Sequence, residues 1–465
     1  MTLPVPPLVP LWTSDAIAAA TRGVASTAFS ADGVSFDSRE VLAGDLFVAM
    51  RGEKSDGHAH VAEAMVRGAC AALVSQPVPG PHVLVADTFE ALMALGRAAR
   101  ARTSATVIGV TGSVGKTGTK EALARALRRI APDATHASVK SYNNHTGVPL
   151  SLARMPADTC YAILEMGMNH EGEIRALTRQ VRPHIALITW VAPVHIENFT
   201  SEEGIADAKA EIFEGLEPGG TAILPADNRH LPRLRAAAER HAARILTFGH
   251  APDADVRVLS AQDRGEDGAG IEARIGQETL SFTLGMRGAH WVSNALAVLA
   301  CAHAAGVDVA EAALALGSFT DLVGRGARTR LSLGGGTALL IDESYNANPA
   351  SMAAALAVLG ATPATRRLAI LGAMKELGAH SAALHAGLAG PIADSRVDEL
   401  ALVGAEMDAL QVPGAARLAT AEEALSWARA QLRPGDVLMV KGSNSVGLGR
   451  VVAGLARTIA AEADA

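Results

Sequence analysis

A glycine-rich turn between an apolar strand and a helix constrains this chain more than any other feature. Residues 106–117 read TVIGVTGSVGKT, so an apolar strand over 106–110 runs into the turn and then into a helix that begins near Lys116. Such a turn directs backbone N–H groups and the positive end of the helix toward phosphate oxygens. The segment therefore predicts a site for a nucleoside triphosphate.

The turn differs from the common pattern G-x-x-x-x-G-K-[ST], which needs glycine where this chain has Val110. We expect Gly109, Gly112 and Gly115 to supply the flexibility instead. Lys116 should reach the β- and γ-phosphates, and the Thr117 hydroxyl should bind magnesium. A turn that merely joins strand to helix is the alternative, and the order of glycines, Lys-Thr and helix disfavours it. The expected ATP contacts here are Gly112, Ser113, Val114, Gly115, Lys116 and Thr117.

Strand and helix patterns alternate along the chain, so the predicted class is α/β. At 465 residues the chain is long enough for about three domains. The first unit has strand-like segments at 35–38, 45–49, 71–75 and 82–86 and helices at 60–67 and 89–102. A polar stretch at 102–105 ends this unit, and we expect a small α/β domain over residues 1–103.

The second and third units have the pattern of doubly wound sheets, whose parallel strands alternate with helices. Strands of the second unit are expected at 106–110, 161–165, 185–191 and 221–225, with appended antiparallel strands over 256–284. A Gly/Arg-rich turn at 324–330 leads to a Rossmann-like unit with strands at 338–342, 368–372, 399–403 and 437–440. The predicted domains are 104–324 and 325–465.

Charge and hydropathy exclude other classes of protein. With 41 basic and 48 acidic residues the net charge is −7, which disfavours nucleic acid as a partner. The first residues, MTLPVPPLVPLW, have no cationic segment and are rich in proline, so we expect no signal peptide. The most apolar stretch, 295–307, is shorter than the ~20 residues that a spanning helix needs. We expect a cytoplasmic protein without a membrane span.

Cysteine and lysine usage give two further indications. Cys70, Cys160 and Cys301 lie far apart in apolar sequence, which predicts buried thiols and disfavours disulfides and a zinc site. Only seven of the 41 basic residues are lysine, and a chain that prefers arginine has little reason to keep lysine except where a compact amine is needed. These lysines are Lys54, Lys116, Lys120, Lys140, Lys209, Lys375 and Lys441.

An acidic residue and a histidine follow two of the predicted parallel strands. Glu165 ends the strand at 161–165, and His195 comes shortly after the strand at 185–191, so both are expected at the sheet edge that holds the phosphate turn. Glu165 is a candidate magnesium ligand, and this setting raises the expectation that His195 is functional. Lys209 falls in an expected helix over 202–215, where pairing with a helical neighbour on the surface is the plain alternative.

Taken together, these motifs resemble the Mur ligases, the ATP-dependent amide-forming enzymes of peptidoglycan precursor synthesis. The resemblance covers nearly the whole chain. Within the family, DESYNANPASM at 342–352 resembles the member that adds D-alanyl-D-alanine to UDP-N-acetylmuramoyl-tripeptide. Further matching segments are YNNHTGVP (142–149), GMRGAHWVSNA (285–295), GAMKELG (372–378), KGS (441–443), FDSR (36–39) and RGEKSDGH (51–58).

The resemblance implies roles for individual residues. Lys116 and Thr117 would bind ATP phosphate and magnesium, and Glu165 and His195 would hold a second magnesium ion. Lys209 would be carbamylated by CO₂, which explains why a lysine is kept there. Asn294 would contact adenine, and Arg325 and Glu343 the γ-phosphate and ribose. Ser38 and Arg39 would lie near the uridine diphosphate, and Tyr345, Asn346 and Asn348 near the D-Ala-D-Ala acceptor.

The implied reaction converts the tripeptide carboxylate into an acyl phosphate, which the dipeptide amine then attacks. The expected product is the UDP-MurNAc-pentapeptide used in cell wall synthesis, and we expect a monomer. A sibling ligase that adds one amino acid and a folylpolyglutamate synthetase share the ATP core, but the first hundred residues and 345–349 disfavour both. A P-loop kinase or motor leaves the third unit unexplained, and a non-catalytic nucleotide-binding scaffold needs Lys116 or Glu165 to be used otherwise.

Overall fold

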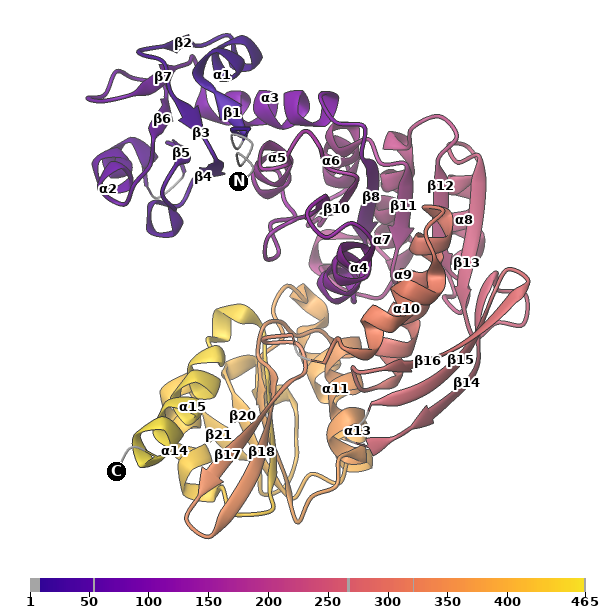
Figure 1. Cartoon of the computed structure of the whole chain (residues 1–465). Coiled ribbons are helices and arrows are strands. Elements are labelled where there is room, and N and C mark those ends of the chain that lie inside the picture. Colours follow the sequence, from indigo (N-terminus) through magenta and orange to yellow (C-terminus); the bar gives the residue numbers. More distant parts are fainter. Residues whose placement is uncertain (1–8, 53–54, 266–267, 321, 464–465) are drawn as a thin grey trace, which may run out of the picture.

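Three sheets, each with its own helices, organise the chain. The computed structural model describes residues 9–52, 55–265, 268–320 and 322–463. A five-stranded, a nine-stranded and a six-stranded sheet follow one another in sequence, and a two-stranded pair accompanies the first. In Figure 1 the three units form an open C, with the N-terminal and C-terminal units as its two arms. The prediction of three α/β units is confirmed, and the proposed boundaries at 103/104 and 324/325 stay predictions.

The N-terminal unit has the strand order β2-β7-β6-β5-β4, in which only β2 runs antiparallel to its neighbour. The strand expected at 35–38 is wrong from residue 36 onward, because β4 ends at Ser35. The Asp37 side chain accepts a hydrogen bond from the Arg39 N–H and starts a 3₁₀ helix, Ser38–Glu40, in place of a strand. Elements are β1 Trp12–Thr13, α1 Ser14–Thr21, β2 Val24–Ala25, β3 Ser30–Ala31, β4 Gly33–Ser35, β5 Asp45–Val48, α2 Val61–Val66, β6 Ala71–Val74, β7 His82–Leu84 and α3 Thr88–Ala101.

The strand of the phosphate turn, β8, lies inside the sheet of the central unit, between β11 and β10. The order is β16-β15-β14-β13-β12-β11-β8-β10-β9. Strands β8 to β14 are parallel to their neighbours in this group, and β15 and β16 are antiparallel additions, as expected. The first half comprises β8 Thr106–Thr111, α4 Lys116–Ile130, β9 Thr135–Ala137, α5 Gly147–Ala153, β10 Tyr161–Glu165, α6 Glu173–Val181, β11 Ile185–Ile188 and α7 Glu202–Ala210. The second half comprises β12 Thr221–Pro225, α8 Leu231–Ala238, β13 Arg244–Gly249, β14 Val256–Asp263, β15 Ala269–Ile275, β16 Glu278–Leu284, α9 Ala289–Ala304 and α10 Val309–Gly317.

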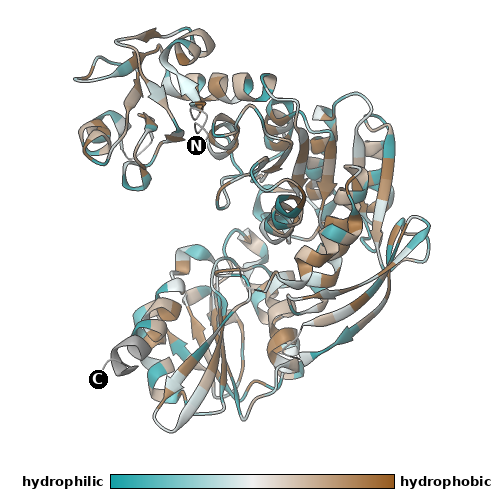
Figure 2. Ribbon diagram, viewed as in Figure 1, coloured by the Kyte–Doolittle hydropathy of each residue, from teal (hydrophilic) through white to brown (hydrophobic). Residues whose placement is uncertain are grey.

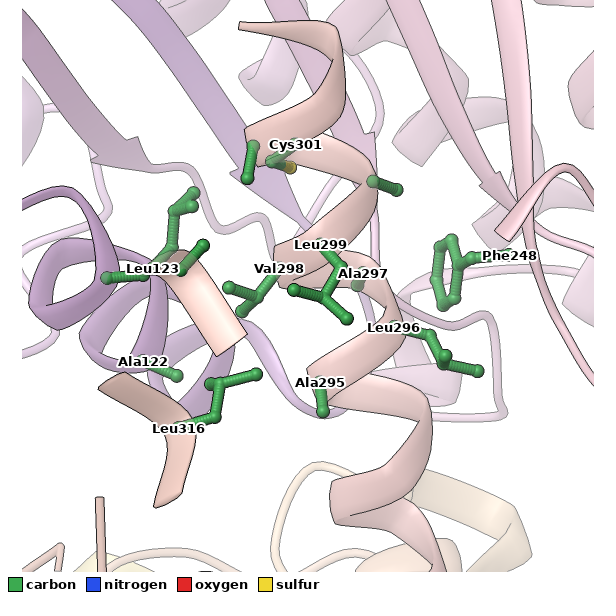
Figure 3. Packing of buried hydrophobic residues seen from close by; sticks show 14 of the residues in the cluster. Ala122, Leu123, Phe248, Ala295, Leu296, Ala297, Val298, Leu299, Cys301 and Leu316 are labelled. Atoms are coloured by element: carbon green, nitrogen blue, oxygen red, sulfur yellow. The ribbon is translucent and has the colours of Figure 1, made fainter. Parts of the chain in front are cut away.

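Helix α9 is the centre of the largest apolar core. Figure 3 shows Leu296 and Val298 of α9 among Leu123 of α4, Leu316 of α10 and Phe248 of β13, all of them buried. Alanines fill much of the remaining helix surface, so neighbouring elements approach α9 closely. Figure 2 shows the same distribution along the ribbon, with apolar residues concentrated on the strands and on the inner faces of the helices.

The cysteine prediction holds for one residue in full. Cys301 of α9 is buried, Cys70 is partly buried, and Cys160 is exposed, so the expectation for Cys160 is wrong. Cys160 precedes β10, and its apolar sequence neighbours belong to the strand rather than to its own surroundings. Burial raises the pKa of the Cys70 thiol to about 11.

The C-terminal unit has the order β17-β18-β22-β19-β20-β21, in which only the β17–β18 pair is antiparallel. The turn expected at 324–330 is shorter than predicted. Gly324 and Gly326 have positive φ, but β17 begins at Ala327, because the alternation that buries Leu331 extends the chain. Elements are β17 Ala327–Leu333, β18 Gly336–Glu343, α11 Pro349–Ala361, β19 Arg367–Gly372, α12 Ser381–Ala386, α13 Ala389–Asp394, β20 Glu399–Val403, β21 Ala416–Leu418, α14 Ala421–Gln431, β22 Val437–Lys441 and α15 Gly449–Ala463.

Over the described residues, no helix has the length and apolar character required to span a membrane.

Candidate active site

A cavity of about 580 Å³ lies between the central and C-terminal units. Its wall combines the turn at 113–118, the ends of β10 and β11, the start of α9 and the segment 343–355. Predicted site residues that line it are Ser113, Val114, Gly115, Lys116, Thr117, Glu165, His195, Lys209, Asn294, Arg325, Glu343, Tyr345, Asn346 and Asn348. Residues from distant parts of the sequence are thus brought to one place.

The phosphate turn has the conformation that its glycines allow. Gly112 and Gly115 have φ values of +153° and +84°, and a Cβ on Gly112 would lie 2.0 Å from Thr189 Oγ1. Lys116 Nζ donates a hydrogen bond to the Gly112 carbonyl over 2.6 Å, so the amine folds back over the turn. The expectation that Gly109 adds flexibility is wrong. Gly109 lies within β8, where a Cβ would come within 2.7 Å of Met166 Cε and 3.3 Å of Pro183 Cβ, so the position is closely packed and a larger residue would require the Met166 side chain to move.

Glu165 is held at the end of β10 with one oxygen unused. Its side chain is 1% exposed. Oε1 accepts hydrogen bonds from Thr117 Oγ1 at 3.2 Å and from Asn143 Nδ2 at 2.8 Å. Oε2 has no hydrogen-bond partner among the described residues, although it is buried. An unpaired buried carboxylate oxygen beside a threonine hydroxyl suits a magnesium ion, which prefers oxygen ligands.

His195 lines the same cavity but is engaged from the C-terminal unit. Its Nδ1 atom lies 2.5 Å from Oε2 of Glu376, which follows β19. This histidine holds the pKa of the Glu376 carboxyl below its usual value. Within the described ranges no three His, Cys, Asp or Glu residues form a ready metal site, so a cation here would also need ligands from bound phosphate or water.

Lys209 is buried in α7, with an exposed fraction of 2%. Its pairing with a surface neighbour, the alternative considered for the sequence, is therefore wrong. Burial, and next the charge of Lys116, lower the pKa of this amine well below its usual value. A lowered pKa favours the neutral amine, which is the form that reacts with CO₂.

The C-terminal unit contributes a second polar wall. The Arg325 guanidinium lies over the Tyr345 ring at 4.4 Å from its centroid, and Tyr345 Oη donates a hydrogen bond to Ser141 Oγ at 2.5 Å. The Asn348 side chain accepts the Ser351 N–H and caps α11, so part of its role is structural. Asn346 is exposed on the cavity wall.

Other residues of the wall were missed as site residues by the sequence prediction. Lys441 Nζ lies 3.3 Å from Glu343 Oε2 and donates a hydrogen bond to the Asn346 carbonyl at 3.0 Å. Asn143 contacts Glu165, and His290 also lines the cavity. All three fall in segments that resemble the family, and this location is the signal that could have identified them as site residues. Their partners come from other elements, which the sequence does not show.

The structure does not bring Ser38 and Arg39 into this cavity. Both lie in the N-terminal unit, where Ser38 Oγ donates a hydrogen bond to Glu63 Oε2 at 3.0 Å. Arg39 makes two side-chain hydrogen bonds to Asp37, which lower the pKa of that carboxyl to about 2. Of the matching segment 51–58, residues 53 and 54 lie outside the described residues.

Three family models match the chain in succession. "Mur ligase family, catalytic domain" matches residues 30–133, "Mur ligase middle domain" residues 110–302, and "Mur ligase, glutamate ligase domain" residues 328–444.

Individual relatives match over nearly the full length. UDP-N-acetylmuramoyl-tripeptide--D-alanyl-D-alanine ligase of Synechocystis sp. is 35% identical over 435 residues, 90% of each chain. The crystal structure of MurF from Acinetobacter baumannii has a TM-score of 0.83 at 31% identity and covers 96% of this chain and 99% of its own. MurF ligase from Thermotoga maritima, in complex with ADP, has a TM-score of 0.76 at 26% identity over 92% and 98% of the two chains. This chain belongs to the Mur ligase family.

Proposed function

We propose that this protein uses ATP to join D-alanyl-D-alanine to UDP-N-acetylmuramoyl-tripeptide, giving the pentapeptide precursor of peptidoglycan. The observation that carries the proposal is the single cavity in which the phosphate turn faces the segment 343–355. Full-length relatives that bear the name of this activity support the same substrates. Both ATP and UDP-linked precursors are cytoplasmic metabolites, so the proposed site of action is the cytoplasm. One copy of the chain supplies the whole cavity, and the proposed form is a monomer.

The reaction has two chemical steps. First, the terminal carboxylate of the tripeptide attacks the γ-phosphorus of ATP, and the bond to the β–γ bridging oxygen breaks to release ADP. Second, the neutral dipeptide amine attacks the carbonyl carbon of the acyl phosphate, the C–O bond to phosphate breaks, and the nitrogen loses a proton as the amide forms and phosphate leaves. Lys116, with its amine over the phosphate turn, neutralises the negative charge that accumulates during the first step. Turn residues 112–117 bind the phosphates through their N–H groups.

Thr117, Glu165 and His195 are the residues proposed to hold magnesium. When bound, the two ions expected from the resemblance supply charge neutralisation at the phosphates. The unpaired Glu165 oxygen supports this assignment. Lys209, as the neutral amine, is proposed to add CO₂, forming an N–C bond and losing one proton, so that a buried neutral group becomes a carbamate anion beside the phosphates. The burial of this amine supports that change.

The remaining proposed contacts come from all three units. Asn294 is placed against adenine, and Arg325 and Glu343 against the γ-phosphate and ribose. Residues 345, 346 and 348 are placed against the acceptor. Ser38 and Arg39 are proposed to bind the uridine diphosphate. The UDP-linked donor therefore extends from the N-terminal arm to the cavity. Asp37 accepts two of the five N–H donors of Arg39, so the remaining donors can contact the diphosphate, whereas a hydrogen bond donated by Ser38 to the ligand would displace Glu63.

Acceptor-dependent phosphate release tests the proposal. The enzyme, ATP, magnesium and the UDP-MurNAc-tripeptide are mixed with D-Ala-D-Ala, D-Glu, diaminopimelate, lysine or no amine, and released phosphate is measured together with the mass of the UDP product. Release and a dipeptide mass increment only with D-Ala-D-Ala support the proposal. Release with another amine assigns the chain to a sibling activity, and release with no amine rejects ligation as the reaction.

A further inference from the structure

The loop between β9 and α5, residues 138–146, contacts all three units. Tyr142 Oη donates a hydrogen bond to Glu40 of the N-terminal unit at 3.2 Å, and Lys140 pairs with the same carboxylate. Asn143 Nδ2 donates to Glu165 at 2.8 Å in the central unit, and Ser141 Oγ accepts from Tyr345 of the C-terminal unit. The position of this loop therefore affects the donor side, the phosphate side and the acceptor side together.

Lys120 is buried beneath this loop and has no place in the mechanism above. It lies one turn after Lys116 in α4 and is 0% exposed. Its Nζ donates hydrogen bonds to the carbonyls of Ser138 at 2.7 Å and Lys140 at 2.6 Å, and lies 2.8 Å from Glu121 Oε1. An ammonium group has three donors, and three acceptors surround this one. The amine is thus fully satisfied by the loop and its own helix.

The loop backbone is bent where Lys120 contacts it. Lys140 has a φ of +52°, a left-handed conformation that is unfavourable for a residue with a side chain. Two carbonyls that are two residues apart point at the same nitrogen. A strained residue of this kind persists only when its surroundings hold it; Lys120 holds the Lys140 carbonyl, while the pair with Glu40 holds the Lys140 side chain.

The contacts continue from this bend to the site. Ser138 Oγ accepts the backbone N–H of Glu165 at 3.2 Å, and Asn143 holds the Glu165 carboxylate. Lys120 therefore acts on both the backbone and the side chain of Glu165 through one loop.

We propose that Lys120 is a positioning residue for the ligase reaction: it fixes the 138–146 loop to the phosphate helix and thereby sets Glu165 and the contact with Tyr345. The expected kinetic effect rests on the proposed function, whereas the contact between Lys120 and the loop is independent of it. A guanidinium is planar and directs its donors as a fork, so arginine cannot reproduce three converging contacts around one nitrogen. Lysine is thus retained here in a chain that otherwise prefers arginine.

Hydrogen exchange and kinetics on four single variants and one double variant test this inference. Lys120→Met keeps the length and removes the donors, Lys120→Arg keeps the charge, and Asn143→Ala removes the contact to Glu165. Leu123→Ala is the matched control, because Leu123 is buried in the same helix but belongs to the apolar core with α9. Amide exchange over 138–146 is measured without substrates, and kcat and KM are measured at a temperature at which every variant is folded.

We expect Lys120→Met to raise exchange in the loop and to lower kcat about 10- to 100-fold, with a KM for ATP within about threefold of wild type. Lys120→Arg should resemble Lys120→Met. Combining Lys120→Met with Asn143→Ala should cost little more than Asn143→Ala alone, because both act through the same loop. Leu123→Ala should lower the thermal midpoint without this pattern.

Unchanged loop exchange in Lys120→Met overturns the inference whatever the activity is. Full activity of Lys120→Arg would show that the charge at this position is sufficient and would overturn the role of the three converging contacts. Additive kinetic effects of Lys120→Met and Asn143→Ala would show that Lys120 does not act on Glu165 through the loop. A wild-type enzyme that fails to use D-Ala-D-Ala rejects the proposed function instead. In that case the exchange measurement, which needs no substrate, still tests whether Lys120 holds the loop.

Discussion

Glu376 and His195, from two different units, meet at 2.5 Å and share an uncommon backbone conformation. Their φ values are +63° and +58°, both left-handed. Two residues further on, Gly378 has a φ of +50°, and a Cβ there would lie 2.6 Å from Glu197 Cβ. Each left-handed residue with a side chain costs roughly 1–2 kcal/mol relative to ordinary backbone. The two loops fit against each other closely enough to maintain this strain at the interface of the central and C-terminal units.

Removing the Glu376 carboxylate should loosen that interface. Glu376 is about half exposed, with a side-chain exposure of 49%, so its contact stabilises the docking of the C-terminal unit on the central unit by no more than ~1 kcal/mol, or about fivefold in the ratio of docked to undocked molecules. Glu376→Ala should therefore enlarge the radius of gyration of the free protein in X-ray scattering. Glu406→Ala is the control, because Glu406 pairs with Lys375 inside the C-terminal unit. Equal scattering from both variants and wild type would contradict a stabilising effect of the Glu376–His195 contact on the interface.

Loss of the Lys116 amine should stop the first chemical step without preventing donor binding. Because this amine lies over the phosphate turn and the proposed donor site lies in the N-terminal unit, the two functions are spatially separate. Lys116→Ala is expected to lower the rate of ADP formation by about 10²–10³-fold. Binding of the UDP-linked donor, measured by calorimetry, should stay within about threefold of wild type. Full turnover by this variant would remove Lys116 from the phosphate site.

Much of this architecture could be predicted because it depends on local sequence patterns. The apolar strand before a glycine-rich turn sets the place of β8, and alternation over 256–284 gives the antiparallel strands. Lysine usage was informative for a physical reason. Lys120, Lys209 and Lys441 are each no more than 2% exposed, in positions where a compact amine meets several acceptors or a small buried space. Lys54 lies outside the described residues.

Contacts between units could not be predicted from the same patterns. The sequence places His195 at a sheet edge, but its pairing with Glu376 depends on how the third unit docks on the second. The strand expected through Ser38 failed for a local reason, since Asp37 offers the backbone a cap that competes with the extended state. Gly109 was misassigned because its close neighbour, Met166, follows a different strand.

Lys209→Ala should abolish ligation, and a small carboxylic acid should restore part of it. The variant leaves a space next to the phosphate site in which formate or acetate can replace the proposed carbamate anion. We expect kcat to fall by about 10²–10³-fold, as for the loss of one well-placed electrostatic group, and to rise severalfold with added acid. Lys209→Arg keeps a cation that cannot form a carbamate and should be inactive with and without acid. Unchanged activity of Lys209→Ala that does not respond to acid would reject the carbamate.

His136 should make the central unit sensitive to mild acid. It lies in β9 with Nε2 2.7 Å from the Ser151 carbonyl oxygen, and burial lowers its pKa from 6.5 to about 4. Between these two values the unfolded chain binds a proton that the folded chain does not, so stability falls as the pH drops through 6.5 toward 4 and is fully present above 6.5. At pH 5 the loss is about 2 kcal/mol.

His136→Gln retains a donor for Ser151 and does not titrate, so its thermal midpoint should fall less between pH 7 and pH 5 than that of wild type. His170→Gln, at an exposed position, is the control and should follow wild type. If His136→Gln and wild type lose the same amount over this range, another buried group is responsible for the sensitivity to acid.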